Sequence, residues 1–197
     1  MSLDLIRSFV WTDFRLAVLF TVIVPLILLV WAFAQKADAI QRLLVIYWRV
    51  ASLLAITVYL MIGSLPISFL TGFCARLLIP LGLWFWVDLN EELDDQFQTP
   101  LKLTFSAWRW AVSAYSVVGA IASIPFLPCS FSQTRFADQF CQVWLDPPFG
   151  YKAFFHANTR PQFLGFLAII ALVIYLLYLV YFVVFRLAKQ GRSAIEQ

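Results

Sequence analysis

The feature that most constrains the fold is a long apolar segment, Leu43 to Val87, whose only charged residues are Arg49 and Arg76. A helix needs about 20 residues to cross the hydrocarbon core of a bilayer, so this segment is too long for one crossing and long enough for two. Glycine and proline mark a turn near its middle, in the stretch Gly63-Ser-Leu-Pro66. The segment therefore predicts a membrane hairpin.

Composition extends this interpretation to the whole chain of 197 residues, of which 62% are apolar and 13% are charged. Such values indicate an integral membrane protein. The first apolar run is too long for a signal-peptide core, and we expect it to remain as a span. We predict one membrane domain, residues 1–197, with an all-α fold: a polytopic transmembrane helical bundle of five spans. The expected spans are about 16–34, 43–64, 67–87, 101–127 and 162–185, with an outer cap loop over 128–161.

The orientation in the membrane follows from the basic residues after the last span. Arg186, Lys189 and Arg192 favour a cytoplasmic C-terminus. Five spans then place the cap loop outside and the acidic segment after residue 87 inside. If the third span is re-entrant, the bundle has four spans plus a re-entrant hairpin, and the N-terminus moves inside.

Three arginines lie within the expected spans and are candidates for binding an anion or a lipid: Arg49, Arg76 and Arg109. Arg49 and Arg109 share a depth of roughly 10 Å below the cytoplasmic surface, at 1.5 Å of helix rise per residue. They can extend to the head groups or pair with nearby carboxylates, or they can form an anion pocket between the second and fourth helices. Arg76 lies near the bilayer centre, four residues before Pro80, so it requires a specific partner.

The segment that follows the third span is acidic. Its carboxylates are Asp88, Glu91, Glu92, Asp94 and Asp95. They are candidates for docking a basic surface of a partner, and the alternative is that they hold Mg²⁺ for a diphosphate.

The fourth span has a stripe of small residues that recurs every three or four positions around Arg109. Its small members are Ser106, Ser113, Ser116, Ala120 and Ser123. Small residues let membrane helices approach closely, so we predict that this stripe packs against protein.

Two cysteines in the cap loop, Cys129 and Cys141, lie on the predicted oxidising side. A disulfide between them would contribute about 3 kcal/mol in the chain-entropy model, and the alternative is a pair of free thiols. His156 is the only histidine, so histidine-pair metal and haem sites are excluded within one chain, and we predict no metal site. No catalytic residues are predicted because no nucleophile elbow, P-loop or zinc-protease motif is present. No basic block indicates nucleic acid.

Several strings of this sequence resemble those of a known family. They are Trp48-Arg-Val-Ala-Ser52, Leu83-Trp-Phe-Trp-Val-Asp88, Ser106-Ala-Trp-Arg109, Phe155-His-Ala-Asn-Thr159 and Lys189-Gln-Gly-Arg-Ser193. The chain resembles a family of cyanobacterial polytopic membrane proteins of similar length whose function is unknown. The resemblance implies a thylakoid or plasma membrane of an oxygenic phototroph, and it implies no catalytic residues.

Two functions are compatible with these features. The first is a non-enzymatic auxiliary or assembly subunit of a larger photosynthetic or respiratory membrane complex. It would contact other integral membrane proteins, lipid or pigment through the small-residue stripe and through Tyr175, Tyr178 and Tyr181. The second is a small enzyme or carrier that binds a lipid or an isoprenoid through the intramembrane arginines and the acidic segment.

Overall fold

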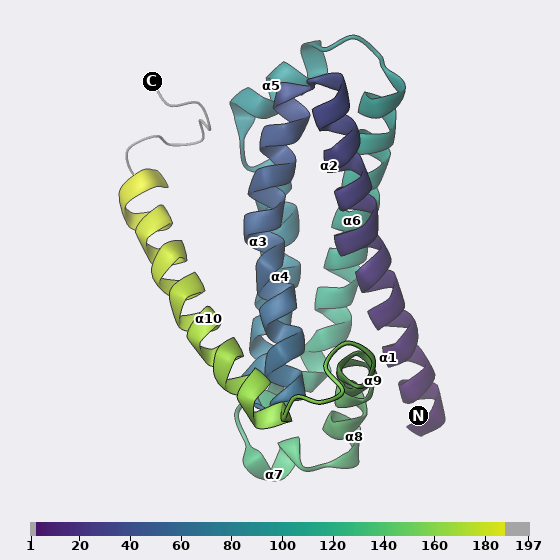
Figure 1. The fold of residues 1–197 in the computed structure, drawn as a ribbon, viewed down its shortest axis with the longest axis vertical. Helices are drawn as coiled ribbons and strands as arrows, with labels where there is room; N and C mark the ends of the chain where they lie inside the picture. Colours follow the sequence, from purple (N-terminus) through teal and green to yellow (C-terminus); the bar gives the residue numbers. More distant parts are fainter. Residues whose placement is uncertain (1–2, 188–197) are drawn as a thin grey trace.

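The computed structural model describes residues 3–187, and every regular element within them is a helix. Five helical segments in this part of the chain are long and apolar enough to cross a membrane. They are Leu3–Gln35, Asp38–Ile62, Ile67–Trp84, Pro100–Ser130 and Pro161–Phe185. The fold is the predicted all-α polytopic bundle (Figure 1). The basic residues Lys189 and Arg192, on which the predicted orientation depends, lie outside the described residues.

The first spanning helix consists of α1 (Leu3–Val18), the π-helical turn η1 (Leu19–Ile23) and α2 (Val24–Gln35). The helix begins at Leu3, before residue 16, where the predicted membrane span begins. Ile6 and Val10 lie four residues apart on one helix face, and both are buried in a cluster with residues of the cap. The early turns are therefore helical because they have a core of their own to pack against.

Pro25 interrupts the backbone hydrogen bonds of this helix, as expected for a proline inside a span. Its ring nitrogen cannot donate to the carbonyl of Thr21, and the π-helical turn frees the neighbouring carbonyl of Phe20. Side chains from other helices supply the missing donors. The Tyr47 hydroxyl donates to the Thr21 carbonyl at 2.8 Å, and Trp108 Nε1 donates to the Phe20 carbonyl at 2.8 Å. The interrupted helix is thus tied to two neighbours.

The helices α3 (Asp38–Ile62) and α4 (Ile67–Trp84) form the predicted hairpin. Ser64 is the turn residue with a left-handed backbone, at φ 53°. Gly63 has another role, because a Cβ there would lie 2.6 Å from the Cα of Gly165 on α10 (Pro161–Tyr181). The two glycines let α3 and α10 cross closely, and α10 then diverges from α3 toward its C-terminal end, which continues as η4 (Phe182–Leu187) (Figure 1).

The acidic segment is a helix, α5 (Val87–Asp95), and not an extension of the third span. Leu89 and Leu93, four residues apart, are buried in the main core, which turns the acidic residues toward other faces. A short link then leads to α6 (Pro100–Ser123), where the Thr99 hydroxyl accepts a hydrogen bond from the Lys102 amide. We call this end of the bundle the α5 end.

The cap at the opposite end is made of five short helical elements. They are η2 (Ile124–Ser130), α7 (Gln133–Phe136), α8 (Gln139–Gln142), η3 (Val143–Leu145) and α9 (Asp146–Phe155). Cys129 and Cys141 form a disulfide, and both are buried with the aromatic residues of the cap. We call this the disulfide end. The helix α9 lies across the long helices there (Figure 1).

Candidate intramembrane binding site

A large cavity lies between the first spanning helix and the α3–α4 hairpin, and α9 borders it at the disulfide end. Its volume is about 850 Å³. Its lining on the first helix extends from Val10 to Val22, a length of roughly 18 Å at 1.5 Å per residue. Most of the wall is apolar. Phenylalanine and tryptophan rings come from Trp11, Phe14, Trp48, Phe69, Phe73, Phe126, Trp144, Phe154 and Phe155.

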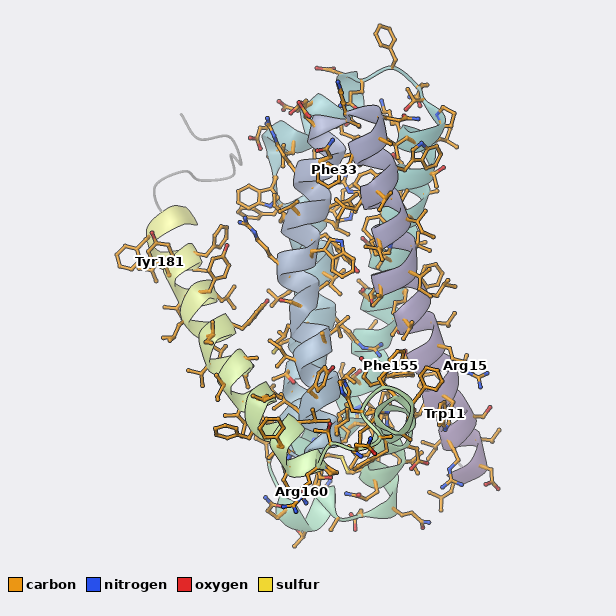
Figure 2. The ribbon with its side chains drawn as sticks, viewed as in Figure 1. Trp11, Arg15, Phe33, Phe155, Arg160 and Tyr181 are labelled. Atoms are coloured by element: carbon orange, nitrogen blue, oxygen red, sulfur yellow. A yellow bond between two sulfur atoms is a disulfide. The ribbon has the colours of Figure 1, made fainter. Side chains whose placement is uncertain are left out.

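The helix α9 closes this end of the cavity by packing directly on α1. A Cβ at Gly150 would lie 2.8 Å from the Trp11 ring, so the glycine is needed for this approach. Trp11 and Phe155, labelled in Figure 2, both line the cavity at the junction of these two helices.

One buried ion pair lies in the cavity wall. The Arg76 guanidinium on α4 contacts the Asp13 carboxylate on α1, and each side chain is 11% exposed. The Tyr115 hydroxyl on α6 donates to Asp13 Oδ1 at 2.9 Å, and the guanidinium carbon lies 5.6 Å from the centre of the Tyr115 ring. Gly119 provides the space, because a Cβ there would overlap Arg76 Nη1. The cluster links three helices, and each charge of the pair is matched by the other.

Arg76 thus has the specific partner that its depth requires, and sequence reasoning missed that partner. Asp13 precedes the predicted first span, which begins at about residue 16. The signal was present, because Ile6, Val10 and Asp13 follow the spacing of one helix face. Extending the first helix toward its N-terminus would have placed Asp13 on the face that packs against the bundle.

Arg109 on α6 is not part of this ion-pair cluster and contacts residues of α4 and α5 instead. Its Nη2 donates to Asn90 Oδ1 at 2.6 Å, and its guanidinium carbon lies 3.6 Å from the centre of a Trp84 ring. Within the described part of the chain, its Nε has no hydrogen-bond partner. Arg109 therefore joins α6 to the junction between α4 and α5.

Arg49 on α3 is exposed, and its Nη1 donates to the Tyr178 hydroxyl on α10 at 3.3 Å. Tyr175 on the same helix is buried, whereas Tyr181 lies on the outer side of α10 (Figure 2). The structure therefore does not bring Arg49, Arg76 and Arg109 into one pocket. The shared depth of Arg49 and Arg109 did not imply a shared face, because each points from its helix toward a different neighbour.

The acidic residues of α5 lie away from the cavity, and none of them lines it. Glu91, Asp94 and Asp95 are exposed, while Asp88 and Glu92 are half-buried. Residues 3–187 contain no group of three or more histidine, cysteine or acidic side chains arranged to hold a metal ion.

The small-residue stripe of α6 is buried at its centre, against α4. Ser113, Ser116 and Ala120 are buried, and Ser106 and Ser123 at the two ends are half-buried. Trp84 Nε1 donates to the Ser113 hydroxyl at 2.9 Å, so one serine of the stripe also serves as a polar contact between the helices.

Three polar groups of the cavity lining were not singled out by sequence reasoning. Trp48 Nε1, Ser68 Oγ and Trp144 Nε1 are buried and have no hydrogen-bond partner among the described residues. Nearby, the Tyr59 hydroxyl and His156 Nε2 are 2.9 Å apart and form a hydrogen bond between α3 and the end of α9. No local motif distinguishes these residues from ordinary aromatic and serine positions in a span.

These features define a class: a small polytopic helical membrane protein with an apolar cavity between its spanning helices and one ion pair in the cavity wall. The chain belongs to the family described as proteins of unknown function, DUF3177, whose model matches residues 7–195. Searches of curated proteins and of solved structures found no match.

Proposed function

We propose that this protein is a non-enzymatic integral membrane subunit that holds one membrane-soluble amphiphile, a lipid or an isoprenoid, in the cavity beneath α9. The observation that carries the proposal is the cavity itself, with a volume of about 850 Å³. Small-molecule sites in proteins span roughly 300–1,000 Å³ and are mostly apolar with a few polar groups, and this cavity has both properties.

Burial of an apolar chain does not by itself account for selective binding from a membrane. Each CH₂ group removed from water contributes about 0.8 kcal/mol, but a chain that enters from the bilayer is already in hydrocarbon. Preferential binding of one ligand over bulk lipid must therefore come from the shape of the cavity and from polar contacts. The wall supplies both, with rigid aromatic rings along its length and buried polar groups among them.

The carrier form of the lipid-binding hypothesis is better supported than the enzyme form. A diphosphate enzyme would need its cations and Mg²⁺-binding carboxylates around one substrate. Here the three arginines contact different neighbours, and the α5 carboxylates are outside the cavity lining.

The setting in this proposal is a cyanobacterial thylakoid or plasma membrane with the C-terminus cytoplasmic, where the protein acts as an auxiliary or assembly subunit of a photosynthetic or respiratory complex. One observation supports docking at the α5 end. The carboxylates of Glu91, Asp94 and Asp95 are exposed, and Phe97, two residues after Asp95 in the sequence, is 92% exposed. An acidic surface next to an unburied ring suits a basic partner surface.

The cavity is tested by filling it. Ala55 is an exposed cavity-lining residue on α3, so Ala55→Trp adds a large ring with space to enter; Ala107→Trp on the exposed face of α6 is the matched control. The full chain is purified in mild detergent, and retained lipids are measured by mass spectrometry. We expect one enriched amphiphile per chain in the wild type and in Ala107→Trp, and its loss in Ala55→Trp. Retention of the same lipids by all three would overturn the proposal.

Docking is tested separately on the same preparation. The triple change Glu91→Gln, Asp94→Asn and Asp95→Asn removes the exposed charges of α5 without touching the cavity. We expect co-purifying membrane proteins to be lost, and their retention by the wild type to weaken as salt is raised. If the same proteins co-purify at every salt concentration with the triple variant, α5 does not dock them.

A further inference from the structure

We infer that the amphiphile in this cavity has a neutral head group that bears a carbonyl oxygen, and that this head group binds at the disulfide end, against Ser68 and Trp144. The inference rests on the proposed function and specifies the chemistry of its ligand.

The first argument is the presence of buried donors without acceptors. Ser68 is 0% exposed and Trp144 is 9% exposed, both line the cavity, and neither Ser68 Oγ nor Trp144 Nε1 has a hydrogen-bond partner within residues 3–187. Buried polar groups are nearly always paired. An indole N–H can only donate, so the group that pairs with Trp144 must be an acceptor, and the Ser68 hydroxyl can donate to an acceptor as well.

The second argument is the charge of the wall. A phosphate head group would need a cation that is not already matched. Arg76 is matched by Asp13, whose other carboxylate oxygen accepts the Tyr115 hydroxyl, so this cluster offers no net charge to a ligand. Arg15 is the other cation of the lining; it is exposed, and its side chain extends on the side of α1 away from α9 (Figure 2). The lining therefore favours a neutral acceptor over an anion.

The third argument places the head group along the cavity. Ser68 lies in the first turn of α4, and its neighbour Phe69 packs in the same buried cluster as Trp144. Both donors therefore belong to the disulfide end, where α9 covers the cavity. The remaining unpaired donor is Trp48 Nε1 on α3. Trp48 lies 11 residues before Tyr59, which contacts His156 at the disulfide end, so Trp48 is roughly 16 Å from Tyr59 along the helix. Two donors at one end and one at the other favour the disulfide end for the head group, with the apolar chain directed toward Trp48.

The experiment uses the purified full chain in detergent and three probes with chains of similar length. A decyl-substituted benzoquinone and a diacylglycerol both carry neutral carbonyl heads, from an isoprenoid-type and an acyl source; phosphatidic acid carries an anionic head. Binding is followed by quenching of tryptophan fluorescence for the quinone and by its displacement for the two lipids. We expect at least one neutral probe to bind. The neutral probe that binds more tightly shows whether the ligand is of the isoprenoid type or the acyl type.

The variants remove one donor each while keeping the shape of the side chain. Ser68→Ala and Trp144→Phe should each weaken binding of the neutral probe about fivefold, the usual effect of one neutral hydrogen bond. Ser123→Ala and Trp110→Phe are the matched controls. The Ser123 hydroxyl is already bonded to the Gly119 carbonyl, Trp110 is exposed outside the cavity, and both variants should bind like the wild type. Thermal unfolding of each variant shows that it is folded.

The outcomes separate this inference from the function on which it rests. If Ala55→Trp abolishes binding while Ser68→Ala and Trp144→Phe bind like the wild type, the cavity holds a ligand and the head-group assignment is wrong. Tighter binding of phosphatidic acid that is lost in Arg15→Gln also overturns it, in favour of an anionic head at the rim. If only Trp48→Phe weakens binding, the orientation is reversed. If Ala55→Trp binds every probe like the wild type, the proposed function itself fails.

Discussion

Replacing Asp13 with asparagine tests whether the ion pair in the cavity wall holds the first helix to the bundle. Asparagine keeps the shape of the side chain and can still accept from Tyr115, but it leaves the Arg76 guanidinium without a counter-charge. Both partners are only 11% exposed, so water cannot replace the carboxylate. Removing one partner of a buried pair costs about 3–5 kcal/mol, and we expect Asp13→Asn to lower the free energy of unfolding by this amount.

The chain contains its own control. Arg7 Nε and Asp146 Oδ2 lie 3.0 Å apart in a second ion pair, which joins α1 to α9 of the cap, but these side chains are 56% and 40% exposed. Exposed pairs contribute about 0–1 kcal/mol, so Asp146→Asn should have a small effect. Unfolding of the purified protein in mixed micelles, with a rising fraction of denaturing detergent and tryptophan fluorescence as the signal, measures both variants under the same conditions.

A double variant separates the charge from the contact. Asp13→Leu with Arg76→Met removes both charges and fills the space with apolar groups. The double variant should lose less free energy of unfolding than Asp13→Leu alone or Arg76→Met alone, because no charge is left buried without its partner. If Asp13→Asn costs no more than Asp146→Asn, or if the double variant is the least stable of the set, the buried pair does not hold the first helix in place and this reasoning is refuted.

Three further changes test other contacts of the fold, two of them by the same unfolding assay and one by cross-linking. Tyr47→Phe should cost about 1–3 kcal/mol, because the Thr21 carbonyl freed by the interrupted helix would lose its donor inside the bundle. Gly63→Ala should separate α10 from α3, because the added methyl would lie 2.6 Å from the Cα of Gly165, and a cross-link between the two helices should then form less efficiently. Cys129→Ser should cost about 3 kcal/mol and should remove the effect of reducing agents on stability.

The helical fold could be predicted from the sequence because the bilayer imposes it. A backbone in hydrocarbon must satisfy its hydrogen bonds within the helix, so apolar length alone indicates which segments cross, and the five spans follow from it. Mean hydropathy does not indicate the first turns of α1, because the charged residues Asp4, Arg7 and Asp13 lower the average over this stretch while Ile6 and Val10 still pack. Asp13, the partner of Arg76, therefore precedes the predicted first span, although the helix that carries it begins at Leu3.

The cavity could not be predicted in the same way. Its wall combines residues from the start of α1, both helices of the hairpin and the cap, and their relation depends on how α9 crosses the bundle. Depth along a helix is readable from a sequence, but the direction in which a side chain points toward a neighbour is not. Arg49 and Arg109 show this limit, because their equal depth suggested one pocket and their contacts lie on different helices.

The way the first helix is attached explains why a cavity exists beside it. Helices in lipid gain little from burying apolar surface, so polar contacts and close backbone approaches position them. The first helix has such contacts at three levels: Trp11 against α9, Asp13 against α4 and α6, and the freed carbonyls of residues 20 and 21 against α6 and α3. Between these levels Phe14 and Val18 line the cavity. Because the polar contacts carry the attachment, these apolar residues are not required to close against α3 and α4, and the space between them can hold a ligand whose removal leaves the bundle assembled.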